Sequence, residues 1–161
     1  MLPLPASSEE LISFLSIPGD LPPESKAIIW KAFTFAKERH AGQIRESGAP
    51  AITHVLDVAR IIVDYKLDVE AICAALLHDT LEDTATKSDE LAQLFGHTIA
   101  SLVDGVTRLS KQESEGMSKP QLDAKNLRKL FVAMVTDPRV AVIRLADRLH
   151  NMRTIAALTA L

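Results

Sequence analysis

The chain has 161 residues, of which 47% are hydrophobic and 24% charged, and this suits one globular domain with a sizeable core. The formal net charge of -3 excludes a global basic field that would hold nucleic acid or an anionic membrane surface. The single cysteine, Cys73, excludes an internal disulfide, and no apolar run approaches the roughly 18 residues of a membrane span. We therefore expect a reducing, cytoplasmic compartment, with no membrane or nucleic-acid partner.

Helical periodicity recurs along the whole chain. It predicts eight helices, in chain order at about residues 7–17, 22–40, 53–66, 68–78, 89–95, 97–107, 121–135 and 138–152. Two polar loops that contain glycine interrupt them, at 41–52 and 110–120. Because no stretch shows the period-two alternation of strands, we predict an all-α fold, a single bundle of about eight helices. Residues 1–24 are expected to form a short helix and linker, and residues 25–161 the domain itself.

Residues that favour helix starts mark several of these segments. Ser7 and Glu10 have the spacing of a capping box. Thr53 and Ser88 each precede an apolar stripe and are expected to cap their helices. The pair at 137–138, Asp-Pro, predicts the start of the last helix in the same way.

One string of ionisable residues follows the predicted helix 68–78 directly. It contains His78, Asp79, Glu82 and Asp83 within six positions, at the end of an apolar run. A buried carboxylate without a partner costs several kcal/mol or becomes protonated, so a bound cation is the simplest explanation of the string. The alternative is a solvated turn after a helix.

Two further residues are candidate metal ligands. His54 lies on the first turn of a helix after a loop, where it is either a ligand or a satisfied core histidine. Asp147 lies in the middle of the most apolar helix, where aspartate has poor propensity, and it heads a polar stripe with Asn151 and Thr154. A salt bridge with a neighbouring arginine is the alternative role for Asp147. Of the other histidines, His150 is interpreted as a core residue or as support for a ligand.

A set of two imidazoles and two carboxylates restricts the choice of metal. Thiolate-preferring metals are excluded because Cys73 is alone, which leaves Mn, Fe, Co, Zn or Mg. An open position on such a metal acts on phosphoryl groups and lowers the pKa of bound water.

The order of these residues, histidine, then His-Asp, then aspartate, resembles the signature of the HD phosphohydrolase superfamily. Five segments are similar to the hydrolase domain of RelA/SpoT proteins: HAGQIRESG at 40–48, AALLHDTLEDT at 74–84, LFG at 94–96, VDGVTRL at 103–109 and LADRLHNMRT at 145–154. These proteins bind and degrade guanosine tetra- and pentaphosphate, the alarmones of the stringent response. The resemblance extends from about residue 25 to the end of the sequence.

The resemblance implies a manganese-dependent pyrophosphohydrolase that converts ppGpp to GDP and pyrophosphate. The metal ligands of the family correspond to His54, His78, Asp79 and Asp147. Its catalytic acids, which position or deprotonate the attacking water, correspond to Glu82 and Asp83. Its nucleotide pocket corresponds to Arg45, Ser47, Asn151 and Thr154.

Three residues depart from the family pattern. Glu46 replaces the usual lysine between Arg45 and Ser47, while Ala51 and Val55 replace an aromatic residue and a proline. The alternative function is therefore an HD phosphohydrolase for another nucleotide, of the 5′-nucleotidase or dNTPase type. A regulatory domain without activity is a third interpretation, against which the intact pair at 82–83 argues. The resemblance also implies that synthetase and regulatory domains follow in a longer bifunctional protein.

Overall fold

The computed structural model describes residues 3–18, 20–110 and 118–158. Over these residues the chain forms nine helices and no strand, which confirms the predicted all-α class. In chain order they are α1 (Ser8–Phe14), α2 (Pro23–Arg39), α3 (Ala51–Asp64), α4 (Val69–Leu77), α5 (Thr80–Asp83), α6 (Ser88–Phe95), α7 (His97–Ser110), α8 (Lys119–Thr136) and α9 (Pro138–Leu158). The helix beyond the predicted eight is α5, which is too short to show a periodic pattern.

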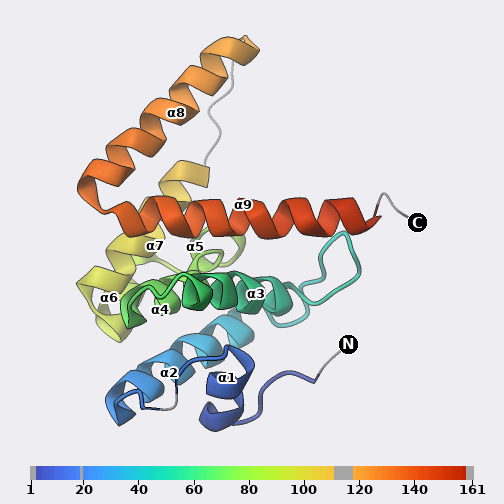
Figure 1. The fold of residues 1–161 in the computed structure, drawn as a ribbon, viewed down its shortest axis with the longest axis vertical. Coiled ribbons are helices and arrows are strands. Elements are labelled where there is room, and N and C mark those ends of the chain that lie inside the picture. Colours follow the sequence, from blue (N-terminus) through green and yellow to red (C-terminus); the bar gives the residue numbers. More distant parts are fainter. Residues whose placement is uncertain (1–2, 19, 111–117, 159–161) are drawn as a thin grey trace.

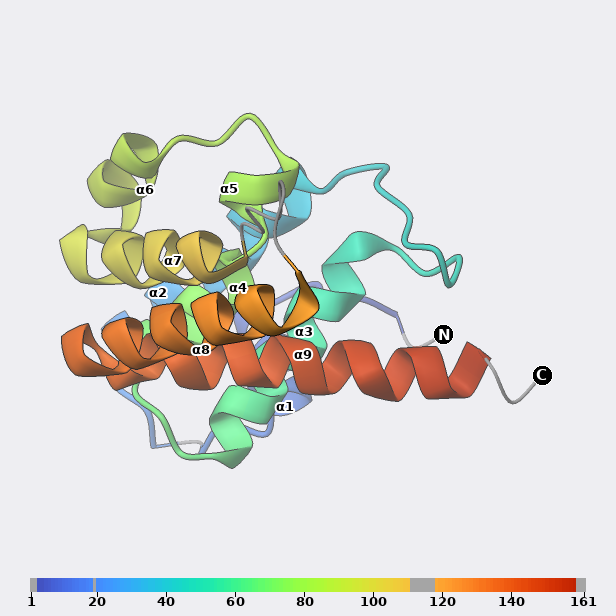
Figure 2. The ribbon, with the colours of Figure 1, turned by 90° about the horizontal axis from the view of Figure 1, so that it is seen from above.

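Helix α4 is the centre of the bundle. It packs against α2, α3, α7 and α9, and its residues from Ala71 to Leu77 are all buried. Figure 1 shows α9 across one side of α3 and α4, with α1 and α2 on the other side. Helix α8 rises away from this body, and Figure 2 shows it from above, over α9. The ends of α4 and α3 and the middle of α9 therefore meet inside the bundle.

The N-terminal helix shares this core. Leu11 of α1 and Leu15, which caps its end, are completely buried in the same apolar cluster as Ile29 and Phe33 of α2. The domain boundary at residue 24 stays a prediction. No helix within the described ranges is long and apolar enough to cross a membrane.

Two of the expected caps are wrong. Helix α3 begins at Ala51 after Pro50, and the Thr53 hydroxyl donates to the Pro50 carbonyl over 2.7 Å. Pro50 fixes its own backbone near the extended region, so the helix starts directly after it. Helix α6 likewise includes Ser88, and Lys87 holds the cap position. In contrast, the Asp137 carboxylate accepts from the Arg139 amide at 3.0 Å, as a cap of α9 should.

The predicted polar loop at 110–120 is partly helical. Helix α7 continues to Ser110, and Ser118 and Gln121 form a capping box at the start of α8. The segment 111–117 lies outside the described residues. Helix α7 also approaches α9 closely, because a Cβ atom on Gly105 would lie 2.9 Å from a Val140 methyl group.

Candidate active site

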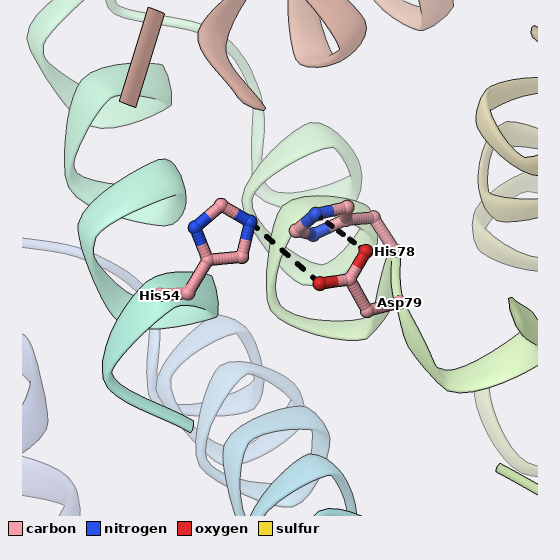
Figure 3. Close-up of side chains that lie close together, drawn as sticks. All are labelled: His54, His78 and Asp79. Atoms are coloured by element: carbon pink, nitrogen blue, oxygen red, sulfur yellow. Dashed lines mark ion pairs between the residues drawn. The ribbon is translucent and has the colours of Figure 1, made fainter. Parts of the chain in front are cut away.

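Three helices bring the first three candidate ligands together. His54 lies on the first turn of α3, His78 ends α4, and Asp79 starts α5. Each offers a ligand atom within 4.8 Å of the others, and their side chains converge in Figure 3. The Nε2 atom of His78 lies 2.9 Å from Asp79 Oδ1, and that of His54 lies 3.6 Å from Asp79 Oδ2.

Asp147 of α9 completes the cluster from the opposite side. Its Oδ1 atom lies 3.2 Å from His54 Nε2 and 3.9 Å from His78 Nε2. Its side chain is only 5% exposed. The structure therefore brings together all four residues that the sequence suggested as metal ligands, from three segments of the chain.

The hydrogen bonds of His78 suit a metal ligand. Its Nδ1 atom donates to the Ala75 carbonyl at 2.7 Å, which leaves Nε2 as the atom that faces the cluster. This Nε2 atom is buried and has no partner in hydrogen-bonding geometry among the described residues. A buried imidazole nitrogen beside two carboxylates requires a cation, either a proton or a metal ion. The donor set of two nitrogens and two carboxylates fits a divalent metal.

The charges of the cluster are coupled. Burial opposes a charge on His78, but the Asp79 carboxylate outweighs burial and raises the pKa of His78 to about 9. Burial also opposes the charge on Asp79, but the imidazolium of His78 holds the pKa of Asp79 well below its usual range. Burial lowers the pKa of His54, which favours its neutral, ligating form. Without a metal, a shared proton therefore compensates the carboxylates.

The Asp147 carboxylate is oriented by its own helix. Arg144, one turn before it, donates to Oδ2 at 2.5 Å, and Asn151, one turn after it, donates to Oδ1 at 2.7 Å. Despite its burial, its pKa is lowered by the hydrogen bond from His54 and by the charges of His78 and Arg144. The arginine salt bridge that was the alternative role for Asp147 is thus present alongside the cluster.

A cavity of about 860 Å³ opens beside the cluster. Its walls include His54, Asp79 and Asp147 and also the four residues predicted to bind substrate, Arg45, Ser47, Asn151 and Thr154. The Thr154 hydroxyl donates within α9, to the backbone carbonyl groups of His150 and Asn151 one turn earlier. The candidate metal ligands and the predicted substrate residues therefore adjoin one cavity.

The loop between α2 and α3 carries Arg45 into this cavity. An antiparallel bridge joins Ile44 to Pro50, and Gly48 at φ +80° makes the turn between them. Arg45 then reaches α9, where its Nη2 atom donates to Asn151 Oδ1 at 2.6 Å. Its partner Asn151 in turn donates to Asp147, so the loop is linked to the cluster.

The two predicted catalytic acids occupy different positions on α5. Asp83 lines the cavity, and burial together with the charge of Asp79 raises its pKa. Both residues are exposed, but Glu82 is not among the residues that line the cavity. The amide of Gln43 donates to the Asp83 carbonyl at 2.9 Å and so joins α5 to the Arg45 loop. The catalytic roles of Glu82 and Asp83 stay predictions.

Sequence reasoning missed two residues of this site. Arg144 lines the cavity and was considered only as an alternative salt-bridge partner. The Gln43 Oε1 atom accepts from His40 Nδ1 at 2.6 Å, while its amide nitrogen donates to the Asp83 carbonyl of α5. The only sequence signal for Gln43 was its position inside the segment 40–48, because its contact with Asp83 spans forty residues.

Known proteins resemble this chain along most of its length. "GTP pyrophosphokinase" of Myxococcus xanthus is 49% identical over 129 residues, 80% of this chain and 17% of that protein. "Bifunctional (p)ppGpp synthase/hydrolase SpoT" of Escherichia coli K12 is 46% identical over 138 residues, 86% of this chain and 19% of that protein. The chain thus spans less than a fifth of the length of these curated relatives.

The fold is also similar to a solved structure. It is that of a metazoan orthologue of SpoT, described as hydrolysing ppGpp and playing a role in starvation responses. The TM-score is 0.65 at 26% identity, over 86% of this chain and 74% of that chain. The family model described as "HD domain" matches residues 32–160, and the chain therefore belongs to the HD domain family.

Proposed function

We propose that this chain is a hydrolase domain that removes the 3′-diphosphate of ppGpp or pppGpp as pyrophosphate, leaving GDP or GTP. The observation that carries the proposal is one cavity that joins three of the four candidate metal ligands, His54, Asp79 and Asp147, to Arg45 and Asn151. A generic HD phosphohydrolase needs the ligands but neither of these two residues. The names of the curated relatives and of the solved structure support the same substrate.

The metal site is proposed to hold Mn²⁺ through His54, His78, Asp79 and Asp147. When bound, such a cation acts as a Lewis acid on phosphoryl oxygens and lowers the pKa of bound water. Hydrogen bonds already hold two of these groups in place, at His78 Nδ1 and at both oxygens of Asp147. Little reorganisation is then needed when the cation binds.

Each substrate residue has a role that follows from its chemistry. The planar guanidinium of Arg45 can stack on the guanine base, and the Asn151 amide can bond ribose or phosphate oxygens. Ser47 and Thr154 line the same cavity and offer hydroxyl oxygens. Water attacks the phosphorus attached to the 3′ oxygen, and Asp83 or Glu82 takes one proton of the water. The bond from this phosphorus to the 3′ oxygen breaks, the 3′ oxygen takes up a proton to become the hydroxyl of GDP or GTP, and pyrophosphate leaves.

The whole protein is proposed to be longer than this chain. Its relatives are about five times as long, and one is named a bifunctional synthase/hydrolase. A synthetase domain and regulatory domains are accordingly proposed to accompany this domain in the native protein. We also propose that it acts in the cytoplasm, where nucleotide substrates are found.

One observation favours the alternative, a phosphohydrolase for another nucleotide. Glu46 lines the same cavity as Arg45, and its carboxylate repels a second diphosphate on the substrate. A nucleotide with a single phosphate chain would suffer less from this charge.

Turnover of a substrate panel tests the proposal against this alternative. The purified chain with Mn²⁺ receives ppGpp, the four dNTPs and nucleoside 5′-monophosphates, and the products are separated by ion-exchange chromatography. We expect GDP and pyrophosphate from ppGpp in equal amounts, and little turnover of the others. Faster release of phosphate from a dNTP or a monophosphate would establish the alternative. The variant Asp147→Asn is the control for contaminating phosphatases.

A further inference from the structure

The second ring nitrogen of His54, which does not face the candidate metal ligands, contacts another histidine. In Figure 3 this nitrogen, Nδ1, points away from His78 and Asp79. It lies 2.7 Å from Nδ1 of His150 on α9, and the two ring centroids are 4.7 Å apart. The imidazole of His54 is 2% exposed, so this nitrogen takes its hydrogen-bond partner from the protein and not from bulk water.

A carboxylate lies at the far side of His150. Asp57 follows His54 by one turn on α3, and its Oδ2 atom lies 3.3 Å from His150 Nε2. His150 likewise follows Asp147 by one turn on α9. Asp57, His150 and His54 thus form a continuous chain of contacts that crosses from α3 to α9 and back. The Asp57 side chain is 44% exposed and that of His150 13%, so water reaches mainly the outer end.

Counting protons on the ring nitrogens of His54 and His150 limits the arrangements that these contacts allow. A contact between two imidazole nitrogens at 2.7 Å needs one proton between them. If His54 supplies it from Nδ1, its Nε2 carries a lone pair towards the cluster and can bind a metal. His150 then accepts on Nδ1, carries its own proton on Nε2, and donates it to the Asp57 carboxylate.

The opposite arrangement is unfavourable at Asp57. If His150 supplied the proton from Nδ1, neutral His150 would present a lone pair on Nε2 to the Asp57 carboxylate. His54 would then carry its proton on Nε2, towards Asp147, and could not bind a metal there. When no cation is bound, Asp147 Oδ1, at 3.2 Å from His54 Nε2, favours that opposite arrangement. A cation in the cluster takes the place of that proton, and with His150 neutral the charge of Asp57 then favours the ligating form of His54, although Asp57 is not among the candidate ligands.

We propose that Asp57 and His150 are positioning residues that hold His54 in its metal-binding tautomer. The inference rests on the metal site of the proposed function and goes beyond it, because neither residue is a ligand or lines the cavity. The competing explanation is a tie between α3 and α9 that serves stability alone. Carboxylate and carbonyl partners of ligating histidines raise their basicity, and their loss weakens metal binding about 10–100-fold.

Mn²⁺ affinity of two variants at His150 separates these explanations. In His150→Leu the acceptor for His54 is lost, and we expect the Kd for Mn²⁺ by titration calorimetry to rise about 10–100-fold. In His150→Asn a side-chain oxygen near the place of Nδ1 can still accept, so most of the affinity should return. The matched control is His97→Leu, at an exposed histidine that starts α7.

The outer carboxylate is tested separately. Asp57→Asn should weaken Mn²⁺ binding by less than His150→Leu, about tenfold or below, because the amide that replaces the carboxylate can still accept through its carbonyl oxygen. Asp64→Asn, also exposed on α3, is its control and should bind Mn²⁺ like the wild type. Because Asp57 is half exposed, this variant provides the test even if His150→Leu fails to fold.

The tautomer itself is observed by ¹⁵N NMR of the imidazoles in the wild-type chain loaded with diamagnetic Zn²⁺. We expect protons on Nδ1 of His54 and Nε2 of His150. A proton on Nδ1 of His150 would overturn the positioning role of Asp57 and His150 and leave the metal site intact. A normal Mn²⁺ affinity with a lower Tm in His150→Leu, or in Asp57→Asn if His150→Leu does not fold, would overturn it as well. A wild-type chain that binds no Mn²⁺ would contradict the proposed function and this positioning role together.

Discussion

Asp147 combines two roles that the sequence presented as alternatives. It pairs with Arg144 through Oδ2 and faces the imidazoles of His54 and His78 through Oδ1. A carboxylate has enough lone pairs for both, so an arginine neighbour one turn away does not argue against a ligand role. Arg144 instead fixes the orientation of the carboxylate within the apolar helix.

Arg45 is the residue that most directly tests substrate recognition. Arg45→Ala should raise the KM for ppGpp by a factor equivalent to about 1–3 kcal/mol, with little change in kcat, because a binding interaction is removed. Arg60→Ala, on the exposed side of α3, is the matched control. Steady-state kinetics with ppGpp and with a base-free phosphate ester measure the effect. An equal loss on both substrates would show that Arg45 binds phosphate and not guanine.

The two acids of α5 can be separated by isosteric amides. Glu82→Gln and Asp83→Asn should each lower kcat about 10²–10⁴-fold while Mn²⁺ affinity is kept, because each removes proton transfer or water positioning. We expect the larger loss at Asp83, since it lines the cavity and Glu82 does not. Single-turnover rates at saturating Mn²⁺ measure this. An unchanged rate in Glu82→Gln would assign the role to Asp83 alone.

Residue types predicted the ligands of the site but not their supporting contacts. His54, His78, Asp79 and Asp147 stand out because ionisable groups in apolar segments need an explanation. The contact of His54 with His150 joins residues 96 positions apart, and that of Gln43 with Asp83 joins residues 40 apart. Such pairs depend on how α3, α5 and α9 cross, which a one-dimensional pattern does not contain.

At the scale of elements, periodicity located the long helices and missed local detail. Helices α2, α4 and α9 begin or end within a few residues of the predicted bounds, because apolar stripes and prolines mark them clearly. Helix α5 has four residues and no stripe; hydrogen bonds from the amides of Glu82 and Asp83 to the Asp79 carbonyl define it. This short helix separates the ligand Asp79 from the predicted catalytic acids.

The crossing of α7 and α9 depends on a glycine. A Cβ atom at Gly105 would lie 2.9 and 3.1 Å from the two methyl groups of Val140, closer than normal contact. Gly105→Ala should therefore lower the free energy of unfolding by about 1 kcal/mol, since overpacking costs about 1–3 kcal/mol and outweighs the gain in helix propensity of about 1 kcal/mol. Urea denaturation measures the change.

Two further variants test this explanation. Adding Val140→Ala should recover part of the loss in Gly105→Ala, because the removed methyl groups are the ones that clash. Ser101→Ala, on the exposed side of α7, should be neutral or stabilising. Additive losses in the double variant would contradict a direct clash.

At the scale of the whole molecule, the bundle keeps a charged cluster beside its most buried helix. The folded pKa of His78 is raised from 6.5 to about 9, so its contribution to stability is complete below pH 6.5 and disappears as the pH rises towards 9. Asp79 and Asp147 have lowered pKa values, so their contributions are present above 3.8 and are lost as the pH falls through the folded values.

The combined contribution of His78, Asp79 and Asp147 to the stability of the metal-free chain should accordingly be greatest between about pH 4 and 6.5. Urea denaturation in EDTA, at pH values from about 5 to 9, should show a falling free energy of unfolding. With saturating Mn²⁺ this alkaline loss should vanish, because the cation replaces the proton between His78 and Asp79. An identical pH dependence with and without Mn²⁺ would show that the cation binds elsewhere.

The central claim is that His54, His78, Asp79 and Asp147 together hold the cation on which hydrolysis depends. Elemental analysis after dialysis against Mn²⁺, combined with the rate of ppGpp hydrolysis on the same samples, tests it most directly. The wild type should bind Mn²⁺ and release pyrophosphate. Asp79→Ala should retain its helical circular dichroism and lose both bound Mn²⁺ and turnover, since one of the ligands is gone. A normal Mn²⁺ content in folded Asp79→Ala would contradict the account.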